Sequence, residues 1–438
     1  MKMKKVISLL LAASLLSVSF AACGNQGSSG SDNSNAAEML DKSNMFITSQ
    51  EQLFWKTSYG VRYRCNLDLV TEEEKAPEEV FAMEPTLTNK SVDNVYIDSN
   101  WGVEGDTAYG KYDDTDFLYK VTVTGQKTYS VTPWISAEAV NNSELFRDSS
   151  YSHIRDLKCF QPDGEDVFCL VGLNPEYQNK HKEINYRIAR ADKAGKEIHF
   201  VGDENVRAAN MVVYDGWIYY SDNGYIGGGV QKEIDTSRVG LYKIRTDGSE
   251  KTRLLEGGEA LSSEIDYWFG NLSVYKNKLY FIDLRKGSKL CRMNFDGSGL
   301  EQLSKGEADY FTVDEATDTL YYRESTYYNY RRKGNPNNNA NSVYRVDLNT
   351  KEAKQLEQVY LRENTVYLCA NKNYLYFGAY IYFARMYDNI KRMDLTSGKV
   401  MWLNHDLQKV DWEDENGELH SEIKHNTIRW SECTDEKL

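Results

Sequence analysis

The chain has 438 residues, of which 41% are hydrophobic, so it can bury the core of one large domain or of two or three smaller ones. Its formal net charge of −14 argues against nucleic acid as a partner, because gripping phosphates needs clustered lysine and arginine. Tyrosine is frequent, with 32 copies against 15 phenylalanines and 8 tryptophans, and it suits half-buried strands and polar recognition surfaces.

The first residues form a targeting segment. Three lysines are followed by an apolar run from Val6 to Phe20 and by small residues before Cys23. The stretch Phe20-Ala21-Ala22-Cys23 resembles the lipobox of bacterial lipoproteins, although leucine is usual where Phe20 stands. The resemblance implies that residues 1–22 are a signal peptide and that the Cys23 thiol carries diacylglycerol. An ordinary secretory signal with a chance cysteine is the alternative.

Residues 23–40 predict a lipidated cysteine and a flexible linker. Gly, Ser and Asn fill positions 24–35, and such residues do not bury enough apolar surface to offset the entropy of ordering. We therefore expect the protein outside the cytoplasmic membrane, anchored at the bacterial cell surface by lipid, with the membrane as a partner only through that anchor.

A strand, a turn and another strand recur along the rest of the chain. The clearest copies are LYKIRTDGSEKTRL from Leu241, LCRMNFDGSGLEQL from Leu290, VYRVDLNTKEAKQL from Val343 and IKRMDLTSGKVMWL from Ile390, spaced 49, 53 and 47 residues apart. Weaker copies begin at Asn185, Leu118 and Arg62, which makes seven units. An alternating aromatic strand precedes each unit, as in GWIYYSD from Gly216.

A period of about 40 to 60 residues with four short strands in each period is typical of a β-propeller. We predict an all-β fold of about seven four-stranded blades over residues 41–407, with six or eight blades as alternatives and a pair of β-sandwiches as the rival fold. Asp247-Gly248 and Asp296-Gly297 are expected to be tight two-residue turns in which glycine supplies the positive φ. These aspartates are interpreted as hinges of blades.

The repeats resemble those of YWTD propellers of the low-density-lipoprotein receptor and, more closely, repeats of unknown function in secreted proteins of Gram-positive bacteria. The resemblance covers roughly residues 206–405 and implies how blades are built, without any catalytic residue. The YWTD tetrapeptide itself is absent, and YYSD from Tyr219 and YFID from Tyr280 stand in its place.

The end of the chain, residues 408–438, predicts a C-terminal hairpin around Asn416-Gly417 that could close the ring against the first blade. Six cysteines besides Cys23 are scattered, and buried thiols are the expectation for most. Cys159 and Cys169 are the near pair. A turn at Asp163-Gly164 would place them on opposite faces of a hairpin, so a disulfide would need another register, and their state is left open.

Length has been added to the connections between second and third strands, which open on one face of a propeller. The segments from Gly172, Asn223, Ser325 and Tyr380 are the long ones. Aromatic and guanidinium groups on them suit stacking on sugars or clasping a protein. The candidate ligand-binding residues are Tyr327, Tyr328, Tyr330, Arg331, Arg332, Tyr380, Tyr382, Phe383 and Arg385. The alternative is that they belong to tolerated insertions packed on neighbouring blades.

No catalytic or metal motif is recognised among the six histidines, and His420 and His425 would point to opposite faces of a strand. We expect no cofactor and no metal. The predicted function is a binding module for an extracellular polymer or protein. The alternatives are a carbohydrate-active enzyme with a carboxylate pair in the central funnel and a scaffold or sensor subunit of an envelope complex.

Overall fold

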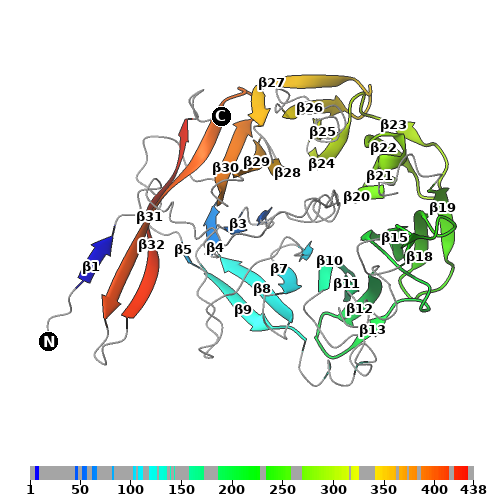
Figure 1. Ribbon diagram of the computed structural model, residues 1–438, viewed down its shortest axis with the longest axis horizontal. Helices are drawn as coiled ribbons and strands as arrows, with labels where there is room; N and C mark the ends of the chain where they lie inside the picture. Colours follow the sequence, from blue (N-terminus) through cyan, green and yellow to red (C-terminus); the bar gives the residue numbers. More distant parts are fainter. Residues whose placement is uncertain are drawn as a thin grey trace, which may run out of the picture.

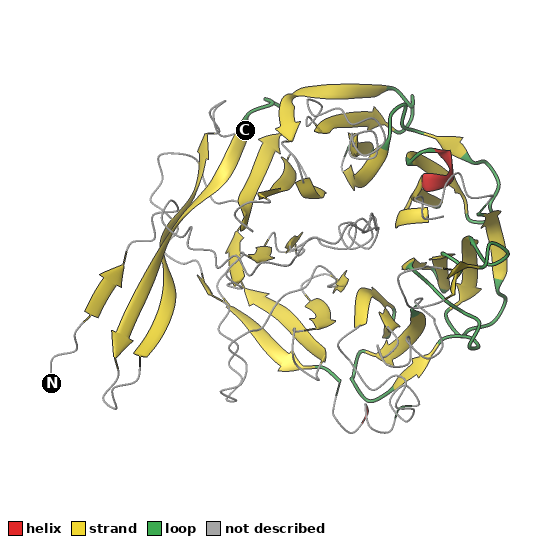
Figure 2. Cartoon of the chain, in the orientation of Figure 1, coloured by secondary structure: helices red, strands yellow, loops and turns green. Residues whose placement is uncertain are grey.

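The structure is a computed structural model (Figure 1). It describes residues 5–8, 45–47, 52–56, 62–66, 81–82, 102–104, 107–111, 118–125, 128–135, 139, 143, 157–171, 186–226, 233–257, 269–314, 317–324, 341–361, 365–371, 374–381, 386–413 and 419–432. Strands make up nearly all of the regular structure in these ranges (Figure 2). Within the same ranges, no helix is long and apolar enough to cross a bilayer.

Seven antiparallel sheets follow one another along the chain, and each contains four consecutive major strands. Blades one to three are β2 (Met45–Ile47), β3 (Gln52–Lys56), β4 (Arg62–Asn66), β5 (Phe81–Ala82); β6 (Gly102–Glu104), β7 (Thr107–Lys111), β8 (Leu118–Gly125), β9 (Thr128–Pro133); and β10 (Leu157–Asp163), β11 (Asp166–Val171), β12 (Arg187–Asp192), β13 (Ile198–Phe200). Blades four and five are β14 (Asn210–Tyr214), β15 (Trp217–Asp222), β18 (Gly240–Arg245), β19 (Thr252–Glu256); and β20 (Phe269–Tyr275), β21 (Lys278–Asp283), β22 (Lys289–Asn294), β23 (Glu301–Gln302). Blades six and seven are β24 (Ala308–Asp314), β25 (Thr319–Glu324), β26 (Asn341–Asp347), β27 (Ala353–Leu361); and β28 (Thr365–Asn371), β29 (Tyr374–Ile381), β30 (Met386–Asp394), β31 (Val400–Glu413).

The sheets stand around a centre, and the chain visits them in order (Figure 1). In blades two to seven the first strand lies toward the centre and the fourth at the rim. First strands of successive blades are neighbours, because β14 contacts β20, β20 contacts β24 and β24 contacts β28. The prediction of a β-propeller is confirmed, and its described strands form seven blades, one for each repeat unit.

Both faces of the second strands of blades three to six are buried, because each of these blades lies between two others. In β15, Tyr219 packs with Leu279 and Phe281 of blade five. The next residue, Tyr220, packs on the other side with Phe168 and Leu170 of blade three. Both tyrosines are at most 2% exposed. The tyrosines of this strand therefore build the junctions between blades, whereas Tyr242, Tyr275 and Tyr344 are half-buried in their strands, as expected.

One cross-strand pair occurs in all seven sheets. An aromatic residue on the second strand stands opposite a lysine or arginine on the third. The pairs are Phe54 and Arg64, Tyr109 and Lys120, Phe168 and Arg190, Tyr219 and Lys243, Tyr280 and Arg292, Tyr321 and Arg345, and Tyr376 and Arg392. Directly opposed residues share a face of the sheet. In blades two to six the aromatic member packs in the junction with the following blade.

Arg292 shows what the basic member does. Its side chain is buried between blades five and six, where Nε donates to Oε2 of Glu301 at 2.8 Å and Nη1 donates to the carbonyl oxygen of Leu348 at 3.3 Å. Lys351 Nζ in the same turn as Leu348 donates to Oε1 of Glu301 at 2.9 Å. Hydrogen bonds from Lys351 and then Arg292 hold the pKa of the Glu301 carboxyl below its usual value. The guanidinium of Arg292 thus links blade five to the third-to-fourth turn of blade six.

The turns between third and fourth strands are closed by aspartates, as predicted, but with one more residue than expected. Gly248 N donates to Arg245 O at 2.9 Å, and Arg245 N bonds to Ser249 O, so three residues form the loop. Asp247 Oδ1 accepts from Ser249 N at 2.8 Å. Hydrogen bonds from the Ser249 hydroxyl and amide lower the pKa of this exposed carboxyl. Among the three loop residues, 246–248, only Gly248 has a positive φ, which is 88°. The loop is therefore a type I turn extended by one left-handed residue.

The same glycine also lies against the preceding blade. A Cβ at Gly248 would lie 2.6 Å from the amide nitrogen of Gly202, and one at Gly297 would lie 3.0 Å from the carbonyl oxygen of Leu254. Gly216, in the turn between β14 and β15, has φ of 72° but nothing within 4 Å of such a Cβ. The turns at Gly248 and Gly297 therefore need glycine for contact between blades as well as for conformation.

The near cysteines are not joined to each other. β10 and β11 pair Asp163 with Asp166, so Gly164 and the residue after it form the turn, and a bulge between Lys158 and Gln161 contains Cys159. The predicted turn at Asp163-Gly164 is wrong by one residue. Cys159 and Cys169 both carry thiols, and burial raises the pKa of the Cys169 thiol to about 12.

A long ribbon extends from the outer edge of blade seven (Figure 1). β32 (Leu419–Glu432) pairs with β31 along its whole length, and β1 (Lys5–Ser8) pairs with the other edge of β31 at Lys409–Trp412. The predicted hairpin thus begins within the fourth strand of blade seven. Among the pairings of the described strands, none joins β32 to blade one, and closure of the ring by this hairpin stays a prediction.

Replacing Gly248 with alanine should destabilise the protein more than replacing Gly216. Both substitutions place a side chain at positive φ, which costs about 1 kcal/mol. Only Gly248→Ala also forces a Cβ into the backbone of the preceding blade, which should cost about 2 kcal/mol more. Urea unfolding followed by circular dichroism gives both free energies. Equal losses in the two variants would contradict the contact between blades.

Candidate functional site

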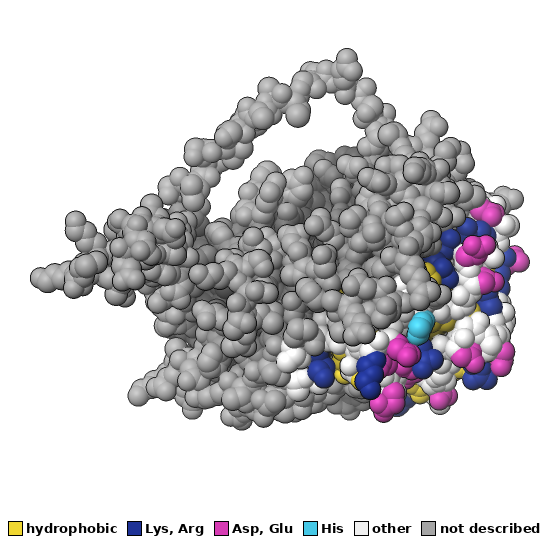
Figure 3. Space-filling view, turned by 90° about the horizontal axis from the view of Figure 1, so that it is seen from below, with side chains coloured by type: hydrophobic (Ala, Val, Ile, Leu, Met, Phe, Trp, Pro, Cys, Tyr) yellow, Lys and Arg dark blue, Asp and Glu magenta, His cyan; other side chains and the backbone are white. Residues whose placement is uncertain are grey.

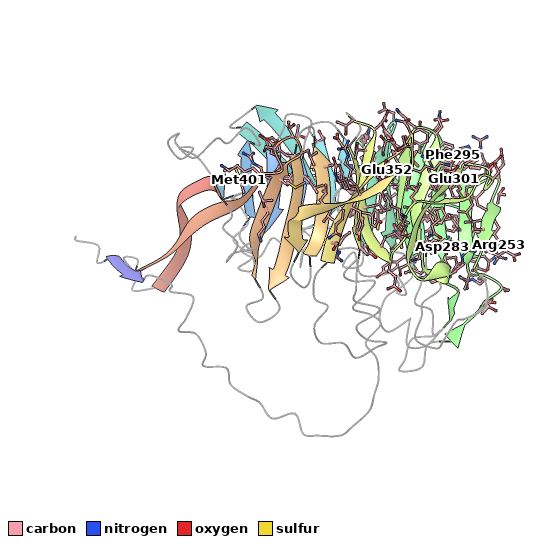
Figure 4. The ribbon with its side chains drawn as sticks, turned by 90° about the horizontal axis from the view of Figure 1, so that it is seen from above. Arg253, Asp283, Phe295, Glu301, Glu352 and Met401 are labelled. Atoms are coloured by element: carbon pink, nitrogen blue, oxygen red, sulfur yellow. The ribbon has the colours of Figure 1, made fainter. Side chains whose placement is uncertain are left out.

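The ring has two distinct faces. Since the strands of a blade alternate in direction, turns between first and second and between third and fourth strands open on one face, here called the hinge face. Connections between second and third strands open on the opposite face, here called the loop face. Figure 4 shows Phe295, in a hinge turn, and Glu301 on one side of the ring, and Asp283, at the end of a second strand, on the other.

The hinge face is tied together from blade to blade. The hydroxyl of Tyr214 in blade four donates to Oδ1 of Asn277 in blade five at 3.4 Å. The hydroxyl of Tyr275 and Nζ of Lys276 in blade five donate to the two carboxylate oxygens of Asp318 in blade six. These contacts link the first-to-second turns of blades four, five and six.

The loop face carries a stapled finger in blade four. The finger, residues 223–239, contains the paired strands β16 (Tyr225–Ile226) and β17 (Glu233–Ile234). At its base, Oδ2 of Asp222 accepts from Nη2 of Arg238 at 3.2 Å, and Oδ1 accepts from the Gly224 amide at 2.8 Å. The amide of Asp235 donates to Gly224 O at 2.7 Å. The two ends of the insertion are therefore held together where it leaves the blade.

The carboxylate at this base is buried. The side chain of Asp222 is 5% exposed, whereas that of Arg238 is 31% exposed. Burial raises the pKa of Asp222 above its ordinary value, against the attraction of Arg238 and the hydrogen bond from Gly224. Ionised Asp222 thus depends on its arginine, which makes Arg238 the residue that keeps the base of the finger closed.

Blade five repeats this device with a shorter connection. Asp283 is fully buried and holds Arg285 in a two-point contact, Oδ1 to Nε at 2.8 Å and Oδ2 to Nη2 at 2.7 Å. Arg285 also lies over the ring of Phe269 and donates to the carbonyl oxygen of Glu256 in blade four. A short 3₁₀ helix, η3 (Leu284–Lys286), completes the connection. Asp222 and Asp283 are the last residues of YYSD and YFID, so the acid of each tetrapeptide anchors the connection that follows it.

Two buried polar atoms beside the finger have no hydrogen-bond partner in the described structure: Oγ of Ser221 and Oδ1 of Asn223. Both residues are at most 4% exposed. Ser221 stands opposite Leu241, whose side chain packs with Phe269 of blade five, so Ser221 faces that junction. Such atoms are costly to bury without a partner. Both atoms are enclosed by the protein in the described structure.

The described residues offer no metal centre, since no three of their histidine, cysteine, aspartate and glutamate side chains could hold an ion together. On the outer wall, acidic and basic side chains are interspersed with little apolar surface on the part that Figure 3 colours. Tyr214, on the hinge face, is the large hydrophobic side chain that is exposed among the described residues, at 39%.

The predicted ligand-binding residues fall mostly outside the described part of the chain. Cys23 and Tyr327, Tyr328, Tyr330, Arg331, Arg332, Tyr382, Phe383 and Arg385 lie outside it. Tyr380 lies in β29, at an irregularity between Ala379 and Ile381 in its pairing with β30. The segment with the three tyrosines leaves β25 at Glu324 and enters β26 at Asn341, so it belongs to the connections of the loop face.

No family model matches the chain, and no curated protein matches it. Among solved structures, it is similar to a protein described as TolB from Agrobacterium tumefaciens, with 13% identity and a TM-score of 0.38 over 60% of this chain and 80% of that one. It is similar to apo AztD from Citrobacter koseri, with 12% identity and a TM-score of 0.42 over 82% and 84% of the two chains. A puromycin-hydrolyzing peptidase from Mycobacterium tuberculosis gives 11% identity and a TM-score of 0.46 over 89% of this chain and 60% of that one. Likenesses this low carry no argument about activity.

Replacing Arg238 with methionine should open the base of the finger in a pH-dependent way. At about pH 8, the loss of the partner of a buried carboxylate should lower the free energy of unfolding by about 2 kcal/mol. Burial already raises the pKa of Asp222, and loss of the arginine should raise it further. The loss of unfolding free energy should therefore be full above the pKa that Asp222 has in the variant, and should shrink as pH falls through that pKa.

The measurement is urea unfolding of both proteins at about pH 8 and about pH 5. Lys276→Met is the matched control, because its ion pair with Asp318 is exposed and should contribute less than about 1 kcal/mol. An Arg238→Met deficit that is the same at both pH values would show that Asp222 does not need its arginine.

Proposed function

We propose that the chain is a binding module that acts outside the cytoplasmic membrane and holds an extracellular polymer or protein on its loop face. The observation that carries this proposal is where length has been added. The long connections follow the second strands of blades three, four and six, at residues 172–185, 223–239 and 325–340, whereas the connection after Tyr380 in blade seven, expected to be long, spans only residues 382–385. Function is commonly grafted onto loops that a rigid scaffold presents.

The geometry of blade four supports the proposal. Free loops lose conformational entropy when they bind, so a loop held at its base binds at lower cost. The pairing of Asp222 with Arg238 and of β16 with β17 fixes the direction in which the finger leaves the blade.

The place of action belongs to the same proposal. Residues 1–22 are removed, Cys23 carries the lipid, and residues 24–40 are the tether that lets the propeller stand off the membrane. In the full chain, β1 within residues 1–22 pairs with β31, and cleavage would vacate that edge. The likeness of the repeats to YWTD propellers and to secreted proteins of Gram-positive bacteria agrees with this location.

The enzyme alternative requires two carboxylates free to act on a glycosidic bond. Asp222 and Asp283, the buried acids at the described loop face, are each held by an arginine. They are anchors of connections in our proposal, and no described contact favours a reaction over binding. A scaffold or sensor subunit of an envelope complex remains a form of the same binding role, with a protein as the ligand.

The test is binding of the purified chain to a glycan array, beside a variant with Tyr327, Tyr328 and Tyr330 replaced by alanine. We expect the variant to lose at least about tenfold in affinity, since aromatic platforms supply much of the contact energy with sugars. Tyr214→Ala is the control, because Tyr214 is exposed on the hinge face.

Equal binding by the triple variant would remove these tyrosines from the site. Loss of binding in Tyr214→Ala alone would move the site to the hinge face. If neither the parent chain nor the variants bind any glycan, a protein is the remaining ligand class, and capture from an envelope extract replaces the array.

A further inference from the structure

The ribbon of β31 and β32 extends from the outer edge of blade seven (Figure 1). β30 pairs with β31 up to Trp402, and beyond that residue β31 and β32 pair with each other along the rest of the ribbon. β32 has no second pairing partner among the described strands, although it is 14 residues long. Apart from the pairing of β31 with β1 at Lys409–Trp412, this ribbon is two-stranded. A two-stranded ribbon is marginally stable in water, and a long unpaired edge invites further pairing.

The sequence of β32 is complementary to itself in one antiparallel register. β32 contains a bulge, because His405 and Leu407 of β31 pair with Ile428 and His425, so one extra residue lies between the latter two. Positions along β32 can be counted outward from His425, with the bulge residues 426 and 427 together counted as one step. A two-fold axis through His425 then puts residue 422 of one copy opposite residue 429 of the other, because each lies three steps from the axis.

In that register Glu422 of one copy stands opposite Arg429 of the second, and Ile423 stands opposite Ile428. Two-fold symmetry makes each of these pairs occur twice. Lys424 stands opposite the uncharged bulge, and no like charges face each other. Opposite charges and apolar residues directly across a ladder stabilise it, whereas like charges destabilise it.

We propose that two copies of the chain associate by pairing β32 with β32 in this register, which turns two ribbons into one four-stranded sheet between two propellers. The sheet satisfies the backbone groups of both open edges. This inference is independent of the binding role of the loop face, because the ribbon projects from the rim of blade seven (Figure 1).

The test is the molar mass of the purified chain by light scattering and by sedimentation equilibrium over a wide concentration range. The parent chain should have twice the mass of one chain. Arg429→Glu puts two glutamates opposite each other twice, so it should raise the dissociation constant at least about tenfold. Glu422→Arg should do the same by opposing two arginines.

The double variant Glu422→Arg with Arg429→Glu should restore the dimer, because the pairs are exchanged but kept. Lys424→Glu is the matched control: it changes charge as much as Arg429→Glu does, at a position that faces no charge, and should leave the dimer intact. Circular dichroism melts verify that each variant folds. A monomeric parent chain, a dimer indifferent to Arg429→Glu, or a double variant that stays monomeric would each overturn the proposal.

Discussion

The propeller depends on a cross-strand pair of an aromatic residue and a cation that recurs in all seven sheets. In blades two to six the ring packs in the junction with the next blade, and the lysine or arginine opposite it lies on the same face of the sheet. At Tyr280 and Arg292, the charged end of the arginine bonds to the next blade through Glu301 and the carbonyl oxygen of Leu348. One pair therefore supplies both apolar burial and a polar link between neighbours.

Because of this packing, the hinge face and the loop face differ in what they contact. At Gly248 and Gly297 the turns of the hinge face lie against the preceding blade, so these positions accept little change of side chain. The connections of the loop face leave the blade at its opposite end, where the anchors of Asp222 and Asp283 isolate them from the core. Insertions there leave the junctions undisturbed, which is why a binding role is placed on that face.

Much of the architecture could be predicted from the sequence, because the repeat units and the aromatic strands before them are local patterns. The blade number, the order of strands and the aspartate hinges all follow from those patterns. The finer geometry did not follow. Glycine at positive φ fits both two-residue and three-residue turns, so Asp247-Gly248 alone does not decide between them. In blade three the ladder pairs Phe168 with Arg190, although Arg187 has the place of the basic residue in the repeat beginning at Asn185.

The anchors of the loop face were beyond prediction for a different reason. Asp222 and Arg238 lie 16 residues apart across a long insertion, and no periodic pattern connects them. The acids that end YYSD and YFID are visible in the sequence. Their role as anchors can be inferred only once it is known that each second strand ends at the loop face. The buried acceptors of Ser221 and Asn223 likewise need the junction between blades to be known.

The central claim is that blades two to seven are joined by shared packing at each junction between them. Native-state hydrogen exchange, read by mass spectrometry, tests it most directly. The account predicts that amides of the second and third strands of blades two to seven exchange with one common free energy, equal to that of global unfolding, because none of these blades can open without exposing its neighbours' aromatic residues. Separate free energies for separate blades would show independent units and contradict the account.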